Sequence, residues 1–295
     1  MLIVSGPSSR SLGERIAQLL GVRNVEVESK VFPDGESYVG LRNDVKGEKV
    51  AVIQSTYPPQ DTHLMQLYFL LQAVGRLGAE EVTAVTPYLA YARQDKAFKP
   101  YEAVSIKAVI RCLEALGIRR LITVDVHEPS IFEDAAFAFQ NLSAAKALAE
   151  YFLKLNLGEL WAFAPDVKAT KMAGEAGVIF RTPHGWFRKE RDRDTGEIAL
   201  KSIGGIEVKG KTLILFDDII SSGGTTAAAA KRLKALGAEK VYAACTHPLL
   251  MGEALRKVLQ SGIEELVGTD TVPSPVSKVS VAPLIAQALK SEPET

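Results

Sequence analysis

A pair of acids followed by small polar residues is the part of this sequence best suited to chemistry. Residues 213–226 read LILFDDIISSGGTT, so an apolar run leads to Asp217 and Asp218 and then to a turn of serine, glycine and threonine. Glycines let backbone N–H groups approach an anion at the start of a helix, and the helix-forming segment AAAAKRLKAL follows. Acids could hold sugar hydroxyls while the turn holds a phosphate. The alternative is a buried strand end whose acids only cap the next helix.

The apolar residues before the acids predict the element that positions them. Residues 213–216 form an uninterrupted apolar run, which is typical of a strand buried on both faces of a parallel sheet. Ligands of open α/β sheets bind at the carboxyl ends of such strands. The turn lacks the spacing and lysine of a Walker A loop, and the chain contains no GxGxxG.

Short apolar runs alternate with helical periodicity along the whole chain. The expected strands are LIVSG, KVAVIQST, EVTAVTPY and RLITVDVH in the first half, and LWAFAPD, VIFRTP, TLILFDD, VYAACTHP and EELVGTDTV in the second. This alternation predicts an α/β protein in which helices flank mainly parallel sheets.

A weak internal repeat indicates two related halves. LGAEEVTAV from Leu77 resembles LGAEKVYAA from Leu236, and KVAVIQST from Lys49 resembles KTLILFDD from Lys211, at nearly equal spacing. We therefore expect a duplicated α/β unit, with domains at 1–147 and 148–280 and a closing helix at about 281–295 that packs on the first. The first-half counterpart of the phosphate turn, QSTYPPQDTHLMQL, has neither the paired acids nor the glycine pair, so only the second half should bind a sugar phosphate.

Composition limits the classes of partner. The 295 residues carry 35 basic and 35 acidic side chains, so no global field recruits nucleic acid or a membrane. No apolar run reaches the roughly 18 residues of a membrane helix. The two cysteines, Cys112 and Cys245, form no CxxC pair or zinc spacing. We expect a globular protein of the reducing cytoplasm.

Two segments of the first half could bind a nucleotide. KVFPDGESYVGL, residues 30–41, places an aromatic ring beside two carboxylates, which could stack on a purine and accept hydrogen bonds from its amino group. YARQDKAFKP, residues 91–100, follows a strand and is rich in basic residues that could grip phosphate. A plain hairpin turn and a solvated charged loop are the respective alternatives.

Four motifs together resemble those of a known family. FPDGE, YARQD, TVDVH and DDIISSGGT occur in the order and approximate positions seen in ribose-phosphate diphosphokinases, which have the phosphoribosyltransferase fold, and the likeness extends over nearly the whole chain. The resemblance implies two phosphoribosyltransferase-type domains and transfer of the diphosphoryl group of ATP to the 1-hydroxyl of ribose 5-phosphate. It also implies Mg²⁺ and at least a homodimer, since the adenine site is shared between subunits.

The resemblance assigns roles to individual residues. The implied ATP-binding residues are Phe32, Asp34, Glu36, Arg93, Gln94 and His127, and the implied metal ligands are His127 and Asp166. The ribose 5-phosphate site would comprise Asp217, Asp218, Ser221, Ser222, Gly223, Gly224 and Thr225. Lys189 and Arg191, in a charged hairpin that we expect to be mobile, match the basic pair of the family's catalytic loop.

The match departs from the family at two places, and other functions remain open. Many members have an acid where this chain has Ser221, and a glycine pair where it has 167–169. A phosphoribosyltransferase that consumes phosphoribosyl diphosphate would use the same acidic turn, although it would have no need of the first half. A catalytically silent regulatory subunit is a third possibility, which the retained acids and basic pair oppose.

Overall fold

The chain divides into two compact units, each built around its own sheet. The computed structural model describes residues 1–191, 198–203 and 206–291, of which 188–191 and 198–203 are described by their backbone alone. One unit comprises Met1–Leu142 together with Val281–Thr295, and the other comprises Ser143–Ser280. The division falls a few residues before the boundary expected from the sequence, and the C-terminal segment belongs with the first unit.

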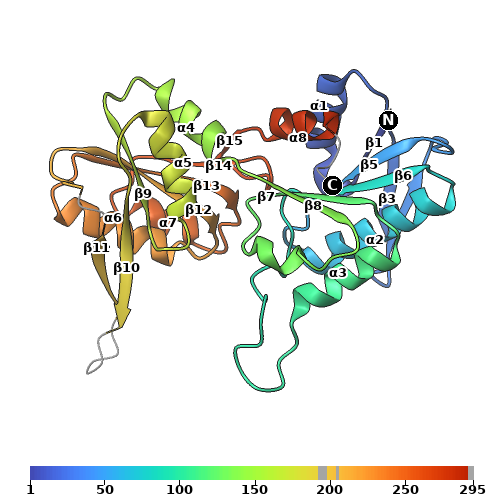
Figure 1. Cartoon of the computed structure of the whole chain (residues 1–295), viewed down its shortest axis with the longest axis horizontal. Coiled ribbons are helices and arrows are strands. Elements are labelled where there is room, and N and C mark those ends of the chain that lie inside the picture. The colour runs from blue at the N-terminus through green and yellow to red at the C-terminus, as the bar shows by residue number, and fades with distance from the viewer. Residues whose placement is uncertain (192–197, 204–205, 292–295) are drawn as a thin grey trace. The chain divides into compact units, whose positions relative to one another are not determined.

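The first unit contains a parallel six-stranded sheet in the order β2-β1-β5-β6-β7-β8. The strands are β1 (Leu2–Ser5), β2 (Asn24–Val25), β5 (Lys49–Ile53), β6 (Glu81–Val85), β7 (Arg120–Val124) and β8 (Ala138–Leu142). A separate antiparallel hairpin is formed by β3 (Val27–Val31) and β4 (Ser37–Leu41). The helices are α1 (Arg10–Leu20), α2 (Gln60–Arg76), α3 (Ser105–Ala115) and α8 (Ala282–Lys290), with short 3-10 turns η1 (Pro7–Ser9) and η2 (Pro129–Phe132) (Figure 1).

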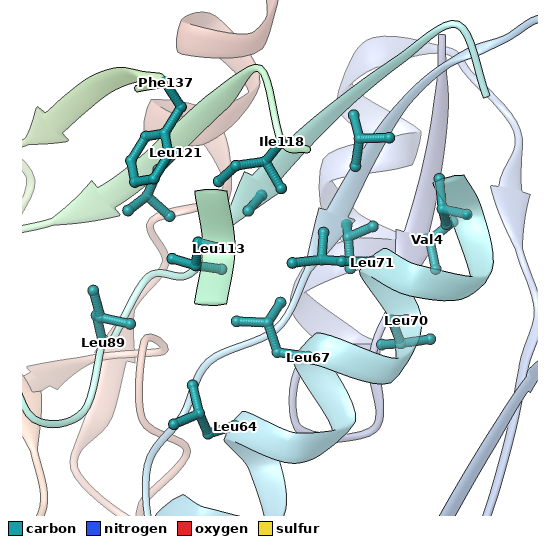
Figure 2. Packing of buried hydrophobic residues seen from close by; sticks show 14 of the residues in the cluster. Val4, Leu64, Leu67, Leu70, Leu71, Leu89, Leu113, Ile118, Leu121 and Phe137 are labelled. Carbon is teal, nitrogen blue, oxygen red and sulfur yellow. The ribbon is translucent and has the colours of Figure 1, made fainter. Parts of the chain in front are cut away.

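One hydrophobic cluster of this unit lies between the sheet and the helices α2 and α3. Leucines of α2 recur every three or four residues, at 64, 67, 70 and 71, which places them on one face of the helix. They pack with Val4 of β1, Leu113 of α3 and Leu121 of β7 in a single cluster (Figure 2). Burial of this apolar stripe therefore fixes α2 and α3 against the strands.

The second unit contains a seven-stranded sheet in the order β11-β10-β9-β12-β13-β14-β15. Its strands are β9 (Leu160–Ala164), β10 (Gly185–Arg191), β11 (Ile198–Ile203), β12 (Thr212–Ile220), β13 (Lys240–Pro248), β14 (Leu266–Thr269) and β15 (Ser277–Val279). All neighbours are parallel except β10 and β11. The helices are α4 (Ala145–Leu153), α5 (Thr170–Phe180), α6 (Gly224–Ala235) and α7 (Ala254–Leu259).

The two sheets share one strand order. In each sheet, five neighbouring parallel strands lie side by side in the same order as along the chain. These strands are β1-β5-β6-β7-β8 in the first sheet and β9-β12-β13-β14-β15 in the second. The repeated segments from Lys49 and Lys211 begin at the equivalent strands β5 and β12. The fold thus confirms the prediction of two mainly parallel α/β halves.

One expected strand is wrong. The segment VIFRTP was predicted to be extended, but residues 178–180 are the last turn of α5, and the capping residue Arg181 that follows has φ 58°. Val178, Ile179 and Phe180 continue a helix whose buried face includes Met172 and Ala176. Tertiary packing of that face prevails over the β preference of the local residues, and the strand begins instead at Gly185.

A buried arginine joins the C-terminal helix to the first sheet. Arg120 of β7 is 4% exposed, and its guanidinium donates to the carbonyls of Ala288 and Ser291 at 3.1 and 3.0 Å and to Gln140 Oε1. Those carbonyls lie at the end of α8, where helical acceptors have no partner within the helix. Arg120 therefore caps α8 from the core.

Replacing Arg120 with methionine should destabilise the protein by about 2–4 kcal/mol, because buried acceptors of α8 and Gln140 lose a charged donor. Arg119→Met is the matched control, since the Arg119 side chain is exposed and its ion pair with Glu81 spans 3.5 Å. Urea unfolding of both variants measures the difference. Equal midpoints for the two would contradict the capping role.

Candidate active site

The acids of the second half lie inside a strand that is longer than the sequence indicated. β12 runs to Ile220, and its parallel pairing with β13 continues past Asp217, opposite Cys245, to Ile220, opposite Pro248. Residues 212–216 are buried, whereas Asp217 and Asp218 are partly exposed at the carboxyl end. The buried half of the strand thus presents the two acids at the sheet edge where ligands of α/β proteins bind.

The surroundings of Asp217, the first acid, disfavour its negative charge. Burial raises the pKa of Asp217 well above its usual value, and the neighbouring Asp218 and Asp166 raise it further. The Asp218 N–H donates to Asp217 Oδ1 at 3.1 Å, and the Ile219 N–H donates to Asp218 Oδ1 at 2.8 Å. An acid held in this way gains from a cation or from hydroxyl donors of a ligand.

The turn after β12 requires glycine at one position. Gly223 precedes α6 in the left-handed region, with φ 71°. A Cβ added there would stand 2.7 Å from Val258 Cγ2 and 3.1 Å from the Ala254 carbonyl. The first N–H groups of α6 follow directly, so the predicted anion turn has the backbone that such a site needs.

Gly223→Ala should cost about 1–3 kcal/mol of stability, because it adds a steric clash to the strain of a left-handed residue. Gly210→Ala is a matched control: Gly210 also has φ 71°, but a Cβ there would meet nothing within 4 Å. Thermal unfolding should show a larger loss for the change at 223. A loss no greater than that of the control would argue that α7 does not confine the turn.

The equivalent turn of the first half is filled by its own side chains. Gln54, Ser55 and Thr56 are at most 1% exposed. Thr56 Oγ1 accepts from the Ala90 N–H at 2.7 Å, and Gln54 Oε1 accepts from the Ser8 N–H at 3.1 Å. The polar side chains that would face a phosphate in this turn are therefore already hydrogen-bonded to the surrounding loops.

The FPDGE motif forms the turn of the β3–β4 hairpin. The Phe32 N–H donates to the Glu36 carbonyl at 2.8 Å, and the Glu36 N–H donates to Asp34 Oδ1 at 3.2 Å. Phe32, Asp34 and Glu36 are all exposed, and Lys30 Nζ lies 4.7 Å from the centre of the Phe32 ring. The hairpin thus presents an aromatic ring and two carboxylates to solvent.

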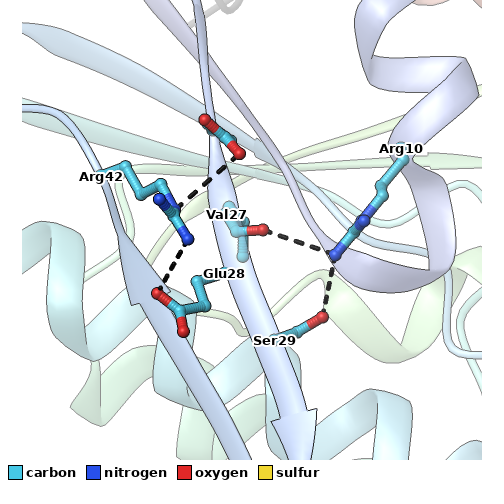
Figure 3. Close-up of polar contacts among 6 residues, drawn as sticks. Arg10, Val27, Glu28, Ser29 and Arg42 are labelled. Atoms are coloured by element: carbon cyan, nitrogen blue, oxygen red, sulfur yellow. Dashed lines mark hydrogen bonds and ion pairs between the residues drawn. The ribbon is translucent and has the colours of Figure 1, made fainter.

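Polar contacts hold this hairpin in place (Figure 3). Arg10 of α1 donates to the Val27 carbonyl at 3.4 Å and to Ser29 Oγ at 3.0 Å. Across the strands, Arg42 Nη2 lies 3.4 Å from Glu28 Oε2. Arg10 thus links β3 to α1, and the Arg42–Glu28 pair joins the two strands of the hairpin.

A pocket of 470 Å³ lies between the hairpin and α2. Gly35, Glu36 and Ser37 line one side, and Asp61, Thr62, Met65 and Phe69 of α2 line the other. Asp61 also accepts a hydrogen bond from the hydroxyl of Tyr91, a residue with φ 68°. Asp61 and Tyr91 thus connect the pocket to the YARQD loop, a link that sequence spacing alone could not reveal.

Arg93 and Gln94 lie in the loop between β6 and α3. Arg93 is exposed. The Gln94 N–H donates to the Tyr91 carbonyl at 3.0 Å, and its side-chain oxygen accepts from Ser105 Oγ. The loop therefore begins with ordered turns that leave the guanidinium of Arg93 available to a ligand.

His127 lies shortly after β7, another parallel strand of the same sheet. It is partly buried, and the following Glu128 accepts from Ser130 Oγ at 2.7 Å as η2 begins. Both this residue and the YARQD loop follow carboxyl ends of neighbouring strands, β7 and β6. Arg93, Gln94 and His127, the candidate nucleotide-binding residues of these two loops, therefore lie at the same edge of the first sheet.

Lys189 and Arg191 lie in an antiparallel ribbon. Both belong to β10, opposite Leu200 and Ile198 of β11. They are two residues apart, which places both positions on the same face of the ribbon. The tip between β10 and β11, residues 192–197, lies outside the described residues. The mobility expected for the hairpin is therefore not tested.

Asp166 belongs to the loop after β9, next to β12 in the sheet. The Lys168 N–H donates to Asp166 Oδ1 at 3.0 Å. Its charge acts on Asp217, so the two carboxylates lie near one another. Within the described part of the chain, no three His, Cys, Asp or Glu side chains are grouped as a metal cage. Carboxylates in small number fit Mg²⁺, which keeps much of its water.

Family models match both halves of the chain. Residues 1–117 match the N-terminal domain of ribose phosphate pyrophosphokinase, and residues 199–288 match the phosphoribosyl synthetase-associated domain. None of the described helices combines the length and apolarity that crossing a membrane requires.

Full-length relatives and a solved structure are similar to this chain. The ribose-phosphate pyrophosphokinase of Methanopyrus kandleri is 40% identical over 99% of both chains, and that of Pyrococcus furiosus is 38% identical over 98% of this chain and all of its own length. The crystal structure of phosphoribosylpyrophosphate synthetase from Mycobacterium smegmatis matches with a TM-score of 0.87 and 28% identity, covering 98% of this chain and 97% of that one.

Proposed function

The chain belongs to the ribose-phosphate pyrophosphokinase family, and from this premise we propose that it transfers the diphosphoryl group of ATP to the 1-hydroxyl of ribose 5-phosphate. The hydroxyl oxygen attacks the β-phosphorus and loses its proton to solvent, the bond from that phosphorus to the α-phosphate oxygen breaks, and AMP leaves. The product is phosphoribosyl diphosphate, a precursor for nucleotide synthesis.

One observation carries the proposal: Asp217 and Asp218 follow the buried part of β12, which ends at Ile220 shortly before a turn whose glycine is left-handed. In the proposed site the acids accept hydrogen bonds from the ribose 2- and 3-hydroxyls. The residues that bind the 5-phosphate are Ser221, Ser222, Gly223, Gly224 and Thr225. Ser221, where relatives often have an acid, contributes a hydroxyl and an amide instead.

The ATP site is proposed in the first unit. Phe32 would stack on the adenine of a nucleotide bound by a neighbouring subunit, while Asp34 and Glu36 accept from its amino group. Arg93, Gln94 and His127 would bind the nucleotide from the other side. Exposure of the hairpin turn supports this assignment, because a ring that serves a partner's site must be presented outward.

Lys189 and Arg191 are the proposed catalytic residues. Diphosphoryl transfer spreads negative charge over the phosphate oxygens, so cations positioned there stabilise the transition state more than the ground state. Their positions on one face of the β10–β11 ribbon support a joint role.

Mg²⁺ is the proposed cofactor, with Asp166 and His127 as ligands. When bound, it would neutralise phosphate charge. The raised pKa of Asp217 beside Asp166 supports a cation at this edge, because such a cation would relieve the repulsion between the carboxylates.

An assembly of at least two subunits in the cytoplasm completes the proposal. The shared adenine site requires a second copy. The exposed Cys112 is a free thiol, which suits a reducing compartment. Light scattering at several protein concentrations would test the assembly, and a monomer at all of them would argue against a shared site.

Supplying two substrate sets separates this function from the alternatives. With ATP, Mg²⁺ and ribose 5-phosphate, we expect AMP and phosphoribosyl diphosphate. With phosphoribosyl diphosphate and adenine but no ATP, we expect no AMP beyond the enzyme-free control. The opposite pattern would indicate a phosphoribosyltransferase, and no turnover with either set would indicate a silent subunit.

A further inference from the structure

A lysine outside the predicted motifs lies beside the phosphate turn. Lys257 belongs to α7, and its Nζ is 3.5 Å from the point that a Cβ on Gly224 would occupy. Ser222 Oγ is 3.8 Å from the same point. One ammonium and one hydroxyl thus flank the open side of the first residue of α6.

The packing of α7 keeps this lysine close to the turn. The Leu250 and Met251 N–H groups donate to the carbonyls of Ile220 and Ser221, each at 3.0 Å. Val258, next to Lys257, packs on Gly223. The segment before α7 is therefore joined to the phosphate turn by backbone hydrogen bonds, and α7 itself by a side-chain contact.

The charge of the expected substrate explains why a cation is needed there. Residues 221–226 contain no charged side chain, and Asp217 and Asp218 precede them. A phosphate dianion bound by this turn would have only amides and hydroxyls as partners while two acids lie nearby. Lys257 is exposed and, within the part of the chain that the structure describes, makes no ion pair, so its ammonium can turn to an anion without losing a partner.

We propose that Lys257 is a further residue of the ribose 5-phosphate site and binds the 5-phosphate through its ammonium. This inference rests on the proposed function, because it takes ribose 5-phosphate as the ligand of the turn. A lysine at this point would add affinity for the phosphorylated sugar and discriminate against ribose, which lacks the anion.

Calorimetry on the full-length protein tests the assignment. Lys257→Gln should weaken ribose 5-phosphate binding about tenfold and reduce the salt dependence of that binding. Lys257→Arg should restore most of the affinity. Arg256→Gln is the matched control, since Arg256 is the adjacent residue of α7 and its Nε is paired with Glu253 at 2.6 Å; it should bind within about twofold of the wild type.

The outcomes distinguish the role of Lys257 from the proposed function on which it rests. Equal affinities of the Lys257→Gln and Arg256→Gln variants, at unchanged melting temperature, would overturn the role of Lys257 and leave the function standing. A fall in the Lys257→Gln variant's melting temperature with unaltered affinity would show a structural role only, which also overturns it. Failure of the wild type to form AMP would instead remove the proposed function.

Discussion

Lys189→Ala should lower turnover about 10²–10³-fold while the dissociation constant for ribose 5-phosphate stays within about twofold of the wild type. Removing a cation that acts on the transferring diphosphoryl group costs transition-state stabilisation and little ground-state binding. Arg191→Ala should behave in the same way, because position 191 lies two residues further along β10 and on the same face.

Arg188→Ala provides the control for this expectation. Position 188 is next to 189 in β10 and therefore on the opposite face of the ribbon. It removes the same charge from the same strand, so it should retain turnover within a few-fold. Quenched-flow measurement of AMP at saturating substrates separates the cases, and near-normal turnover of the Lys189 and Arg191 variants would remove both residues from the catalytic step.

Asp217→Asn should weaken ribose 5-phosphate binding on the order of 10²-fold and at the same time stabilise the protein at neutral pH. The binding loss follows because a carboxylate acceptor of the sugar hydroxyls becomes a neutral amide. The stability gain follows because a partly buried charge, which Asp218 and Asp166 repel, is removed.

The pH dependence of the stability gain has a definite sign. The folded-state pKa of Asp217 is raised above its ordinary value of 3.8, so the native protein holds this proton more tightly than the unfolded chain does. The group favours folding below about pH 4, and that contribution is lost as the pH rises through the folded-state pKa. The advantage of the asparagine variant should therefore be full above that pKa and shrink as the pH falls through it.

Thermal unfolding from mildly acidic to neutral pH, in the presence of a chelator to remove divalent cations, measures this change. Asp44→Asn is a suitable control, because this carboxylate is exposed and accepts from the Lys46 N–H at 3.0 Å in a surface turn. A melting temperature of the Asp217 variant below that of the wild type at neutral pH would contradict a destabilising charge at Asp217.

The parallel strands and the acidic turn could be predicted because local patterns determine them. An uninterrupted apolar run predicts a strand that is buried on both faces. The acids and glycines that follow it are typical of a turn that binds a sugar phosphate. The predicted strand TLILFDD ended two residues too early, at Asp218, because the polar residues at 217 and 218 interrupt the apolar pattern although backbone pairing with β13 continues to Ile220.

Other features depend on contacts between distant segments and leave no local signal. Asp61 and Tyr91 meet only after α2 and the loop beyond β6 have packed, and Lys257 reaches the phosphate turn only through α7. The mistaken strand at 178–183 has the same origin, since the buried face of α5 overrides the β-branched residues near its end.

The diphosphoryl transfer can be followed by incubating the protein with ribose 5-phosphate, Mg²⁺ and ATP labelled in its γ-phosphate. We expect one AMP for each labelled sugar diphosphate, with the label in the sugar product. Release of ADP with a labelled sugar would show transfer of a single phosphoryl group, and absence of AMP would show that the acids of β12 do not present ribose 5-phosphate to ATP. Either result would contradict the function proposed for this chain.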